Sequence, residues 1–235
     1  MSPEILVVRC GIVPYEEARA AQSRLRERRQ KEEVGDVLLL LEHPPVYTRG
    51  RRASAEELPM GREWYERQGI EVRDSDRGGR VTYHGPGQLV AYPIVSLRPY
   101  GDDVLAYVRG LERVMIGALA EHGVEAGLIE GQTGVWVGER KIGSIGVHVS
   151  RGVTTHGLAV NVSNDLQPFE WIVPCGIEGC RVTSLGGELG SAVEVEAFAA
   201  TIATRFGAVF EREPRAVEPA ALGLELPPAT LGIPR

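Results

Sequence analysis

The chain has 235 residues, of which 43% are hydrophobic and 25% are charged, and its formal net charge is −6 at pH 7. These values describe a globular protein of one large domain or two small ones, and the negative charge argues against a general nucleic-acid binder. Three cysteines, Cys10, Cys175 and Cys180, are too few for a disulfide framework and suit a reducing cytoplasm.

The first 50 residues predict a strand, a helix and a second strand. Residues 4–10 are an apolar run, residues 14–35 begin with proline and end with glycine, and residues 36–50 form an apolar strand that leads into a proline-stopped loop. Arginines in the helix alternate with acidic residues, which favours a solvated face over a phosphate-binding one. Without a signal-peptide pattern or a bilayer-length apolar run, we expect a cytoplasmic protein with no membrane partner.

The middle of the chain alternates between helical and β patterns. Residues 54–70 predict a short capped helix, and residues 77–97 hold two apolar runs separated by HGPGQ, which is a β pattern. Residues 102–123 give the clearest helical periodicity. Its apolar positions fall on one face, formed by Leu105, Val108, Leu111, Met115 and Leu119.

The last hundred residues complete one α+β fold. Residues 133–162 predict several short strands with turns at Gly138-Glu139 and Arg151-Gly152, and residues 193–210 predict an amphipathic helix. The expected architecture is a mixed, mostly antiparallel sheet with flanking helices. We assign residues 1–215 to a single domain, leave open a small subdomain from about residue 180, and expect the proline-rich tail, 216–235, to lie extended on the surface.

Lysine is rare in this chain, which draws attention to Lys141. Lys31 and Lys141 are the only lysines among 26 basic residues of the Lys and Arg types. A lysine amine can give up its proton in a suitable environment, whereas an arginine guanidinium effectively cannot. Lys141 begins a glycine-rich strand, so it is either an ordinary surface lysine or a functional amine.

Two glycine-containing stretches have the character of pocket walls. In RGGRVTYHGPGQ, residues 77–88, Gly78 and Gly79 would let a backbone approach a ligand closely, although a tight hairpin with a hydrogen-bonded histidine explains the same pattern. In THGLAVNV, residues 155–162, small residues precede strand-type apolar residues. His156 in this stretch is either a pocket group or a hydrogen-bonded core histidine.

Cys175 is the candidate nucleophile. It lies between Pro174 and Gly176 in a bend expected to expose its sulfur, whereas Cys10 and Cys180 are expected to be buried thiols. The spacing of Cys175 and Cys180 is not that of a standard zinc site. An ammonium about 4 Å from a thiolate is worth up to about 4 kcal/mol at an effective dielectric constant of about 20, so a neighbouring Lys141 would favour the reactive thiolate form of Cys175.

Four stretches, in this order along the chain, resemble the motifs of the lipoyl(octanoyl) transferase family. RGGRVTYHGPGQ resembles its substrate-binding stretch, KIGSIG its lysine motif, HGLAVN its second pocket wall and PCGI its nucleophile motif. HPPVYTRGRRA, residues 43–53, is similar to its N-terminal region. The resemblance covers about residues 43 to 185 and implies the fold shared with the catalytic domains of biotin and lipoate protein ligases.

Carried over residue by residue, the resemblance implies one catalytic acyltransferase domain. Cys175 would form an acyl-thioester intermediate and Lys141 would favour its thiolate form. Apart from the resemblance, His156 is a candidate for a supporting role. The acyl pocket would be lined by Arg77, Gly78, Gly79, Arg80, Val81, Thr82, Tyr83, His84, Ser144, Ile145, Gly146, Gly157, Leu158 and Ala159. No cofactor and no metal ion are implied.

The resemblance also implies two protein partners. Octanoyl-acyl carrier protein would be the donor, and lipoyl domains of 2-oxoacid dehydrogenase complexes and the glycine cleavage H protein would be the acceptors, in the first step of endogenous protein lipoylation. These partners are usually acidic, and a basic patch to receive them could be formed by Arg49, Arg51, Arg52, Arg77 and Arg80.

Three other functions remain open on the residues alone. An ATP-dependent lipoate or biotin protein ligase has related pocket motifs, but it activates the acid as an adenylate and needs no nucleophilic cysteine. A cysteine hydrolase could pair Cys175 with His84 or His156. A non-enzymatic binding protein could use the arginine-rich helix at residues 19–31.

Overall fold

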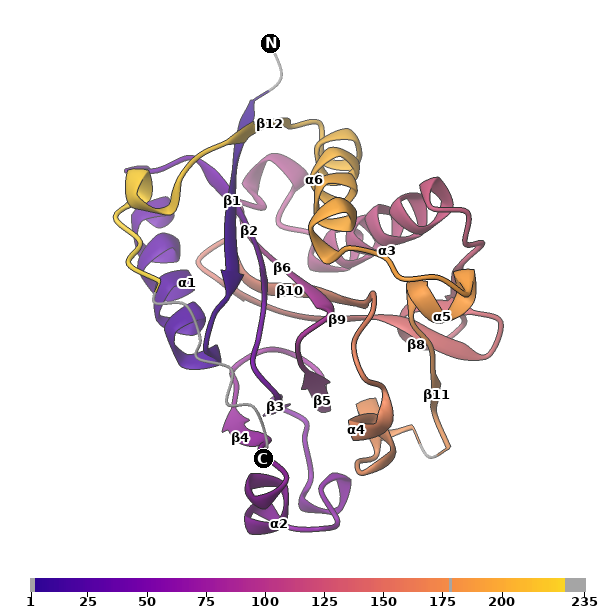
Figure 1. Ribbon diagram of the computed structural model, residues 1–235. Coiled ribbons are helices and arrows are strands. Elements are labelled where there is room, and N and C mark those ends of the chain that lie inside the picture. Colours follow the sequence, from indigo (N-terminus) through magenta and orange to yellow (C-terminus); the bar gives the residue numbers. More distant parts are fainter. Residues whose placement is uncertain (1–2, 178, 227–235) are drawn as a thin grey trace.

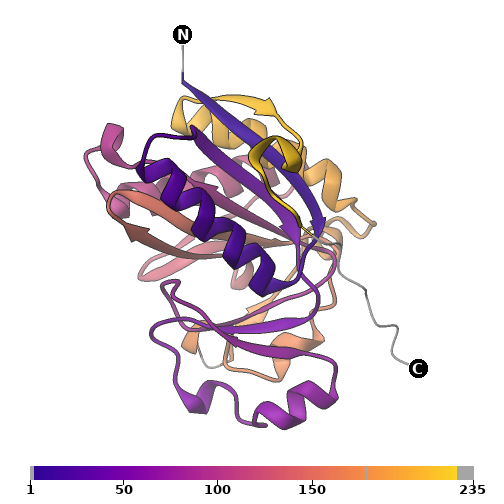
Figure 2. The same ribbon diagram turned by 90° about the vertical axis from the view of Figure 1, so that its left-hand side faces the viewer.

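The computed structural model describes residues 3–177 and 179–226, and the side chain of Cys175 also lies outside what it describes. In this part of the chain, a nine-stranded mixed sheet forms the centre of the molecule, with a separate three-stranded sheet below it (Figures 1 and 2). The predicted fold class, a mostly antiparallel mixed sheet with flanking helices, is confirmed.

The main sheet has the strand order β12-β1-β2-β6-β10-β9-β8-β7, and β11 pairs with β9. Its strands are β1 (Glu4–Ile12), β2 (Asp36–Glu42), β6 (Gln88–Ile94), β7 (Gly127–Ile129), β8 (Gln132–Val137), β9 (Arg140–Ser150), β10 (Val153–Asn161), β11 (Arg181–Val182) and β12 (Glu213–Ala216). Pairing is antiparallel from β2 through β7, and parallel where β1 meets β2 and β12 and where β9 meets β11. The small sheet, in the order β4-β3-β5, consists of β3 (Val46–Arg49), β4 (Glu71–Asp74) and β5 (Val81–His84).

Six α-helices and four short 3-10 helices lie among the described residues. The α-helices are α1 (Tyr15–Gln30), α2 (Arg62–Arg67), α3 (Val104–Glu121), α4 (Gln167–Glu170), α5 (Leu185–Leu189) and α6 (Val195–Phe210). The 3-10 helices are η1 (Ala55–Glu57), η2 (Arg98–Tyr100), η3 (Pro174–Gly176) and η4 (Pro219–Leu222). None of the described helices is both long enough and apolar enough to cross a membrane.

The main sheet is buried on both faces, which explains its uninterrupted apolar strands. Helix α1 covers one face and helices α3 and α6 cover the other (Figure 1). Along β2, Leu38 and Leu40 pack towards α3 and α6, whereas Leu39 and Leu41 pack towards α1. Because successive side chains of a strand point to opposite faces, a strand covered on both sides must be apolar at every position.

Helix α3 forms where the sequence predicts it, but its buried face is shifted at the first turn. Leu105 is 67% exposed, whereas Tyr107 is buried and its ring lies 5.5 Å from that of Phe210 in α6. Leu111, Met115 and Leu119 are buried as predicted. The first buried side chain of the helix is therefore Tyr107, on a different side of the first turn from Leu105, and its ring reaches the neighbouring helix.

The prediction of an extended surface tail is wrong for residues 217–226. The Val217 N–H donates to the Val7 carbonyl, and Leu222 and Leu224 are buried in the cluster that contains α1. Arg28 of α1 donates a 2.7 Å hydrogen bond to the Leu222 carbonyl, so part of the arginine-rich helix is a packing surface. Residues 227–235 lie outside the described residues.

The residues after 180 are built into the main fold. β11 pairs with β9, α6 packs against α3, and β12 pairs with β1 at the edge of the main sheet. We therefore treat the described part of this region as continuous with the domain.

Candidate active site

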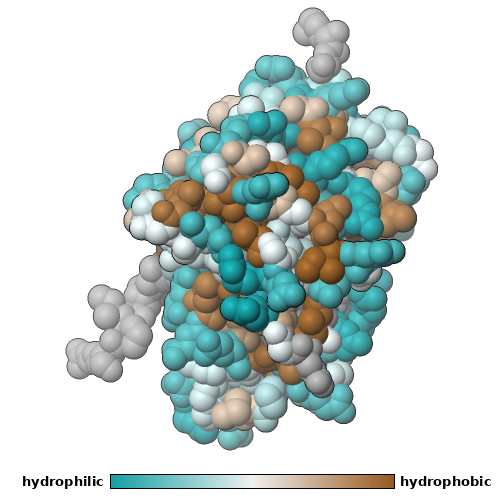
Figure 3. Space-filling model, turned by 90° about the vertical axis from the view of Figure 1, so that its right-hand side faces the viewer, coloured by the Kyte–Doolittle hydropathy of each residue, from teal (hydrophilic) through white to brown (hydrophobic). Residues whose placement is uncertain are grey.

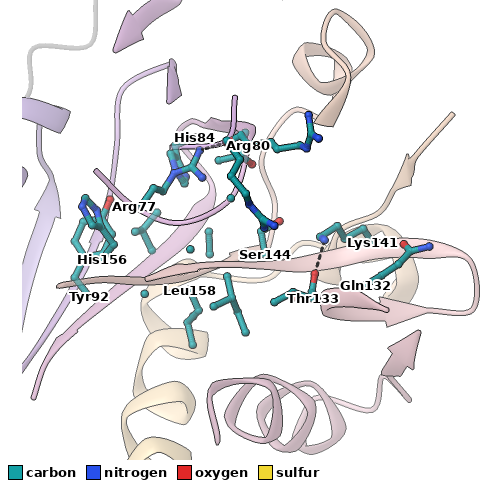
Figure 4. A pocket seen from close by; sticks show the side chains of 18 of the residues that line it. Arg77, Arg80, His84, Tyr92, Gln132, Thr133, Lys141, Ser144, His156 and Leu158 are labelled. Carbon is teal, nitrogen blue, oxygen red and sulfur yellow. Dashed lines mark hydrogen bonds between the residues drawn. The ribbon is translucent and has the colours of Figure 1, made fainter. Parts of the chain in front are cut away.

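A cavity of about 250 Å³ lies between the main sheet and the segment that leads into the small sheet. We call residues 144–146 of β9 and 156–159 of β10 the sheet wall of the cavity. We call the facing segment 76–84, which ends in β5 and contributes several lining residues, the loop wall. Figure 4 shows His156 and Tyr92 at one end of the cavity, and Lys141, Thr133 and Gln132 at the other. The predicted residues that line it are Arg77, Gly79, Arg80, Thr82, His84, Lys141, Ser144, Ile145, Gly146, His156, Gly157, Leu158 and Ala159.

Three predicted pocket residues do not line the cavity. In β5, Thr82 and His84 face the cavity, whereas Val81 and Tyr83 pack into the core of the small sheet. This follows from strand geometry, in which neighbouring side chains point to opposite sides. The third is Gly78, whose N–H donates a 2.9 Å hydrogen bond to the carbonyl of Val147 and so ties the loop wall to β9.

Two glycines of the sheet wall lie where the backbone of a neighbouring segment leaves no room for a side chain. A Cβ atom on Gly157 would lie 2.2 Å from the carbonyl oxygen of Ala91 in β6, and a Cβ atom on Gly146 would lie 2.9 Å from the carbonyl oxygen of Gly78 in the loop wall. Both distances are too short for a carbon atom. Gly157 therefore permits close strand packing, and Gly146 permits the loop wall to approach the sheet wall.

Arg77 holds the loop wall together from within. Its side chain is buried, and its guanidinium donates to the carbonyl and hydroxyl oxygens of Thr48 and to the carbonyl of Arg80, at 2.6 to 3.1 Å. Buried guanidinium groups need such acceptors because an unsatisfied buried charge is costly. Arg77 therefore shapes the wall of the cavity in addition to lining it.

Lys141 is buried at one end of the cavity, next to polar and aromatic groups. Its ammonium donates a 2.7 Å hydrogen bond to the carbonyl of Thr133 and lies 4.8 Å from the centre of the Trp136 ring. Among the described residues, Lys141 forms no ion pair with a carboxylate. A buried ammonium held by a neutral carbonyl and a ring retains its attraction for an anion brought close to it.

The backbone that carries Cys175 approaches the cavity beside Arg80. Cys175 belongs to η3, Ile177 lines the cavity, and a Cβ atom on Gly176 would lie 2.3 Å from the Cδ atom of Arg80. The predicted exposure of the Cys175 sulfur and its distance from Lys141 lie outside the described residues. The N–H groups of Gly176 and Ile177 already donate to the carbonyls of Val173 and Pro174.

Glu57 joins this segment to the loop wall. It is buried, its carboxylate pairs with Arg80 at 2.5 Å and accepts a hydrogen bond from the Val81 N–H. Its carbonyl accepts a hydrogen bond from the Val173 N–H, two residues before Cys175. The structure thus links Glu57, Arg80 and the backbone around Cys175 into one connected unit.

The other end of the cavity holds buried histidines. His156 donates from Nε2 to Asp76 at 2.7 Å, and this hydrogen bond lowers the pKa of the Asp76 carboxyl well below its usual range. Burial lowers the pKa of His156, of His84 and of His43, the last to about 4. These imidazoles are therefore neutral near pH 7, and the His156–Asp76 pair anchors the loop wall to β10.

The two other cysteines, Cys10 and Cys180, are half-buried. Burial raises the pKa of the Cys10 thiol to about 12, which makes this thiol a poor nucleophile at neutral pH. Among residues 3–177 and 179–226, no cluster of three or more histidine, cysteine, aspartate or glutamate side chains could hold a metal ion.

Sequence reasoning missed part of the cavity lining. The additional lining residues are Tyr15, Arg52, Val90, Tyr92, Gly131, Gln132, Thr133 and Ile177. Gln132 and Thr133 come shortly before Lys141 in the same hairpin, so the hairpin pattern itself could have indicated them. Tyr15 begins α1 and Tyr92 lies in β6 of the main sheet, so only the tertiary packing of these elements brings them to the cavity.

Comparison with known proteins identifies close relatives along nearly the whole chain. A family model described as the lipoyl protein ligase A/B catalytic domain matches residues 14–207. An octanoyltransferase from Roseiflexus sp. (strain RS-1) is 46% identical over 216 residues, which cover 91% of this chain and 90% of the relative. An octanoyltransferase from Solibacter usitatus (strain Ellin6076) is 48% identical over 203 residues, which cover 86% of this chain and 91% of the relative.

Solved structures of ligases share the fold at low sequence identity. A bipartite lipoate protein ligase from Thermoplasma acidophilum superposes with a TM-score of 0.69 at 18% identity, over 93% of this chain and 87% of that chain. A biotin protein ligase from Aquifex aeolicus superposes with a TM-score of 0.51 at 15% identity, over 88% and 69% of the two chains. By its sequence relatives, this chain belongs to the octanoyltransferases within the lipoyl protein ligase A/B catalytic domain family, and it is an acyltransferase.

Proposed function

We propose that the chain transfers an octanoyl group from octanoyl-acyl carrier protein to a lysine of a lipoyl domain through a thioester on Cys175. The reaction would take place in the cytoplasm as the first step of protein lipoylation. The observation that carries this proposal is that Lys141, Arg80 and Ile177 line the same cavity, because this brings the backbone around Cys175 to the cavity that holds the buried amine.

The cavity is long enough to hold an eight-carbon chain. The strand register places Val147 opposite His156, so six residues of β9 separate Lys141 from the histidine end, or about 20 Å at 3.3 Å per residue. Seven carbon–carbon bonds of about 1.5 Å make an octanoyl chain no longer than about 10 Å. Burying it against Val90, Leu158 and Ala159 would contribute about 5 kcal/mol at ~0.8 kcal/mol per methylene.

The reaction follows in two balanced steps. The Cys175 thiolate attacks the thioester carbonyl, and the carrier's thiol leaves with a proton from Lys141. The neutral amine of the acceptor lysine then attacks the Cys175 thioester, the Cys175 thiolate leaves, and the proton lost by the attacking amine returns to Lys141. A thioester becomes an amide, which is favourable, so the transfer requires no ATP.

Arginines beside the cavity provide a contact surface for acidic partners. Of the five arginines in the predicted basic patch, Arg77 is buried and Arg49 pairs with Asp74. Arg51, Arg52 and Arg80 are exposed, but Arg80 pairs with Glu57, which leaves Arg51 and Arg52 as the main basic side chains of this surface. The face seen in Figure 3 carries strongly hydrophilic residues across its middle, between hydrophobic patches. We expect the carrier protein, and in turn a lipoyl domain or the glycine cleavage H protein, to approach the exposed arginines.

Intact mass spectrometry with octanoyl-acyl carrier protein tests the proposal. We expect one octanoyl group on Cys175 in the absence of acceptor, and its transfer to a lipoyl domain without ATP. Cys175→Ser should remove the adduct, and the matched control Cys180→Ser should keep it. An adduct that persists in Cys175→Ser, a requirement for ATP, or release of free octanoic acid with no acylated acceptor would each contradict the proposal.

A further inference from the structure

Helix α3 carries a carboxylate in an otherwise apolar environment. The side chain of Glu112 is fully buried, between Leu111 and Met115 of the core and close to strand β8. Burying a carboxylate in a helix face costs stability unless specific partners compensate it. The catalytic scheme above does not use Glu112, so its burial requires a separate explanation.

The two oxygen atoms of Glu112 have different partners. Oε2 accepts a 2.7 Å hydrogen bond from Arg109, whose side chain is about half exposed. Oε1 accepts a 3.1 Å hydrogen bond from the backbone N–H of Gly134 in β8. The second contact joins the helix to the strand that holds Lys141 in place.

The peptide group between Thr133 and Gly134 connects Glu112 to Lys141. Its N–H points to Glu112, and its carbonyl accepts the 2.7 Å hydrogen bond from the Lys141 ammonium. This peptide group thus lies between the carboxylate of Glu112 and the ammonium of Lys141. The two hydrogen bonds polarise the peptide group in the same sense, so each strengthens the other.

This peptide group needs an external restraint. Gly134 has a φ of +115°, and the β8–β9 register is irregular between Val135 and Trp136. Glycine permits several backbone orientations, so the local sequence does not fix the direction of the Thr133 carbonyl. The hydrogen bond from Gly134 to Glu112 fixes it.

We propose that Glu112 is a positioning residue: its carboxylate orients the Thr133–Gly134 peptide so that the Thr133 carbonyl holds the Lys141 ammonium at the reacting end of the cavity. This inference rests on the proposed role of Lys141. It predicts that an oxygen acceptor at position 112 matters more than the negative charge, because the N–H of Gly134 needs only an acceptor.

The test compares Glu112→Leu, which has no acceptor, with Glu112→Gln, which keeps one. For each variant, the rate of Cys175 octanoylation is measured at saturating donor between pH 6 and 9, together with the KM for the donor. We expect Glu112→Leu to lower the rate about 10- to 100-fold with little change in KM, and to move the midpoint of the pH profile towards the ordinary thiol value of about 8.5. Glu112→Gln should stay within about threefold of the parent protein.

Two further comparisons separate positioning from a general structural role. Arg109→Ala removes the exposed partner of Glu112 and should leave the rate and the pH profile unchanged. Combining Glu112→Leu with Lys141→Met should be no slower than Lys141→Met alone, because Glu112 acts through Lys141. If Glu112→Leu does not fold, Glu112→Ala is the second variant, and added formate should restore part of its rate by supplying an acceptor.

The outcomes distinguish this inference from the proposed function. If Lys141→Met is slow while folded Glu112→Leu keeps the parental rate and pH profile, only the role of Glu112 is overturned. Additive losses in the double variant, or a rate of Glu112→Ala equal to that of the parent, would overturn it as well. If Lys141→Met itself retains full activity, the proposed function of Lys141 fails first.

Discussion

The two walls of the cavity are built in different ways. In the sheet wall, β9 and β10 pair without interruption from Gly143–Val160 to Ser150–Val153, and glycines provide the smooth surface. The loop wall has no regular pairing between residues 76 and 80 and depends on the side chains of Arg77, Asp76 and Glu57. The sheet wall therefore fixes the shape available to an acyl chain, whereas hydrogen bonds and ion pairs of charged side chains hold the loop wall in place.

The largest expected effect concerns the reactive end of the sheet wall. Lys141→Met removes an ammonium worth up to about 4 kcal/mol to a nearby thiolate, so Cys175 octanoylation at pH 7 should fall about 100- to 1,000-fold. Lys141→Arg keeps the charge that stabilises the Cys175 thiolate but can neither give nor take back a proton, so both half-reactions should slow, though less than in Lys141→Met. Single-turnover measurements of the two half-reactions check this. Parental rates in both half-reactions with arginine would argue against a role in proton transfer.

A second effect concerns the stability contributed by His43, which is buried and packs against His84 of the loop wall. Burial lowers the pKa of His43 to about 4, below that of the unfolded chain, so the unfolded chain binds the proton first as the pH falls. The contribution of neutral His43 to the free energy of unfolding is complete above about pH 6.5, the ordinary pKa of histidine. It falls by about 3 kcal/mol as the pH is lowered towards 4. In urea unfolding across this range, the free energy of unfolding should depend less steeply on pH in His43→Gln than in the parent protein. Identical slopes would contradict the prediction.

The contact between the walls can be tested with one methyl group. Gly146→Ala places a Cβ atom 2.9 Å from the Gly78 carbonyl oxygen and 3.0 Å from the Arg77 side chain, so the loop wall must move outward. We expect transfer activity to fall about 10- to 30-fold, equivalent to ~1.4 to 2 kcal/mol, with octanoyl-donor kinetics as the measurement. Gly127→Ala in β7 is the matched control, since no atom lies within 4 Å of its Cβ position. If the two substitutions lower the activity equally, the proposal that Gly146 is needed for the approach of the loop wall is wrong.

The smallest effect concerns the outer surface beside the loop wall. Reversing charge with Arg51→Glu, a residue outside the cavity lining, should raise the KM for octanoyl-acyl carrier protein about three- to tenfold, and more at low salt than at high salt. A small octanoyl thioester without the carrier protein should react at the parental rate. An unchanged KM for the carrier would place the donor surface elsewhere.

Short-range patterns in the sequence predicted the turns that bound the strands of the sheet wall, whereas its lining residues were implied by the family resemblance. The turns at Gly138-Glu139 and Arg151-Gly152 separate β8, β9 and β10 where expected, because glycine provides the backbone freedom that tight turns need. Residues 144–146 and 157–159 line the cavity from these strands. β9 and β10 are longer than predicted, because their continuous pairing compensates for the lower stability that glycine gives to a strand.

The loop wall could not be predicted in the same way, because its contacts join distant parts of the chain. Arg77 was predicted as a polar pocket residue, but its hydrogen bonds to Thr48 make it mainly a brace. Glu57 and Glu112 carry no local signal, since a glutamate in a helix is usually solvated. Their burial becomes visible only when strands and helices far apart in sequence are packed together.

The pairing of β12 with β1 has a consequence for how the chain is made. β1 pairs with β2 on one side, but its other edge is covered by residues 213–216, which the ribosome adds long after β1. Until then the first strand presents an open row of backbone hydrogen-bonding groups. A product cut short before Glu213 keeps that row exposed and is prone to associate with other unfinished copies.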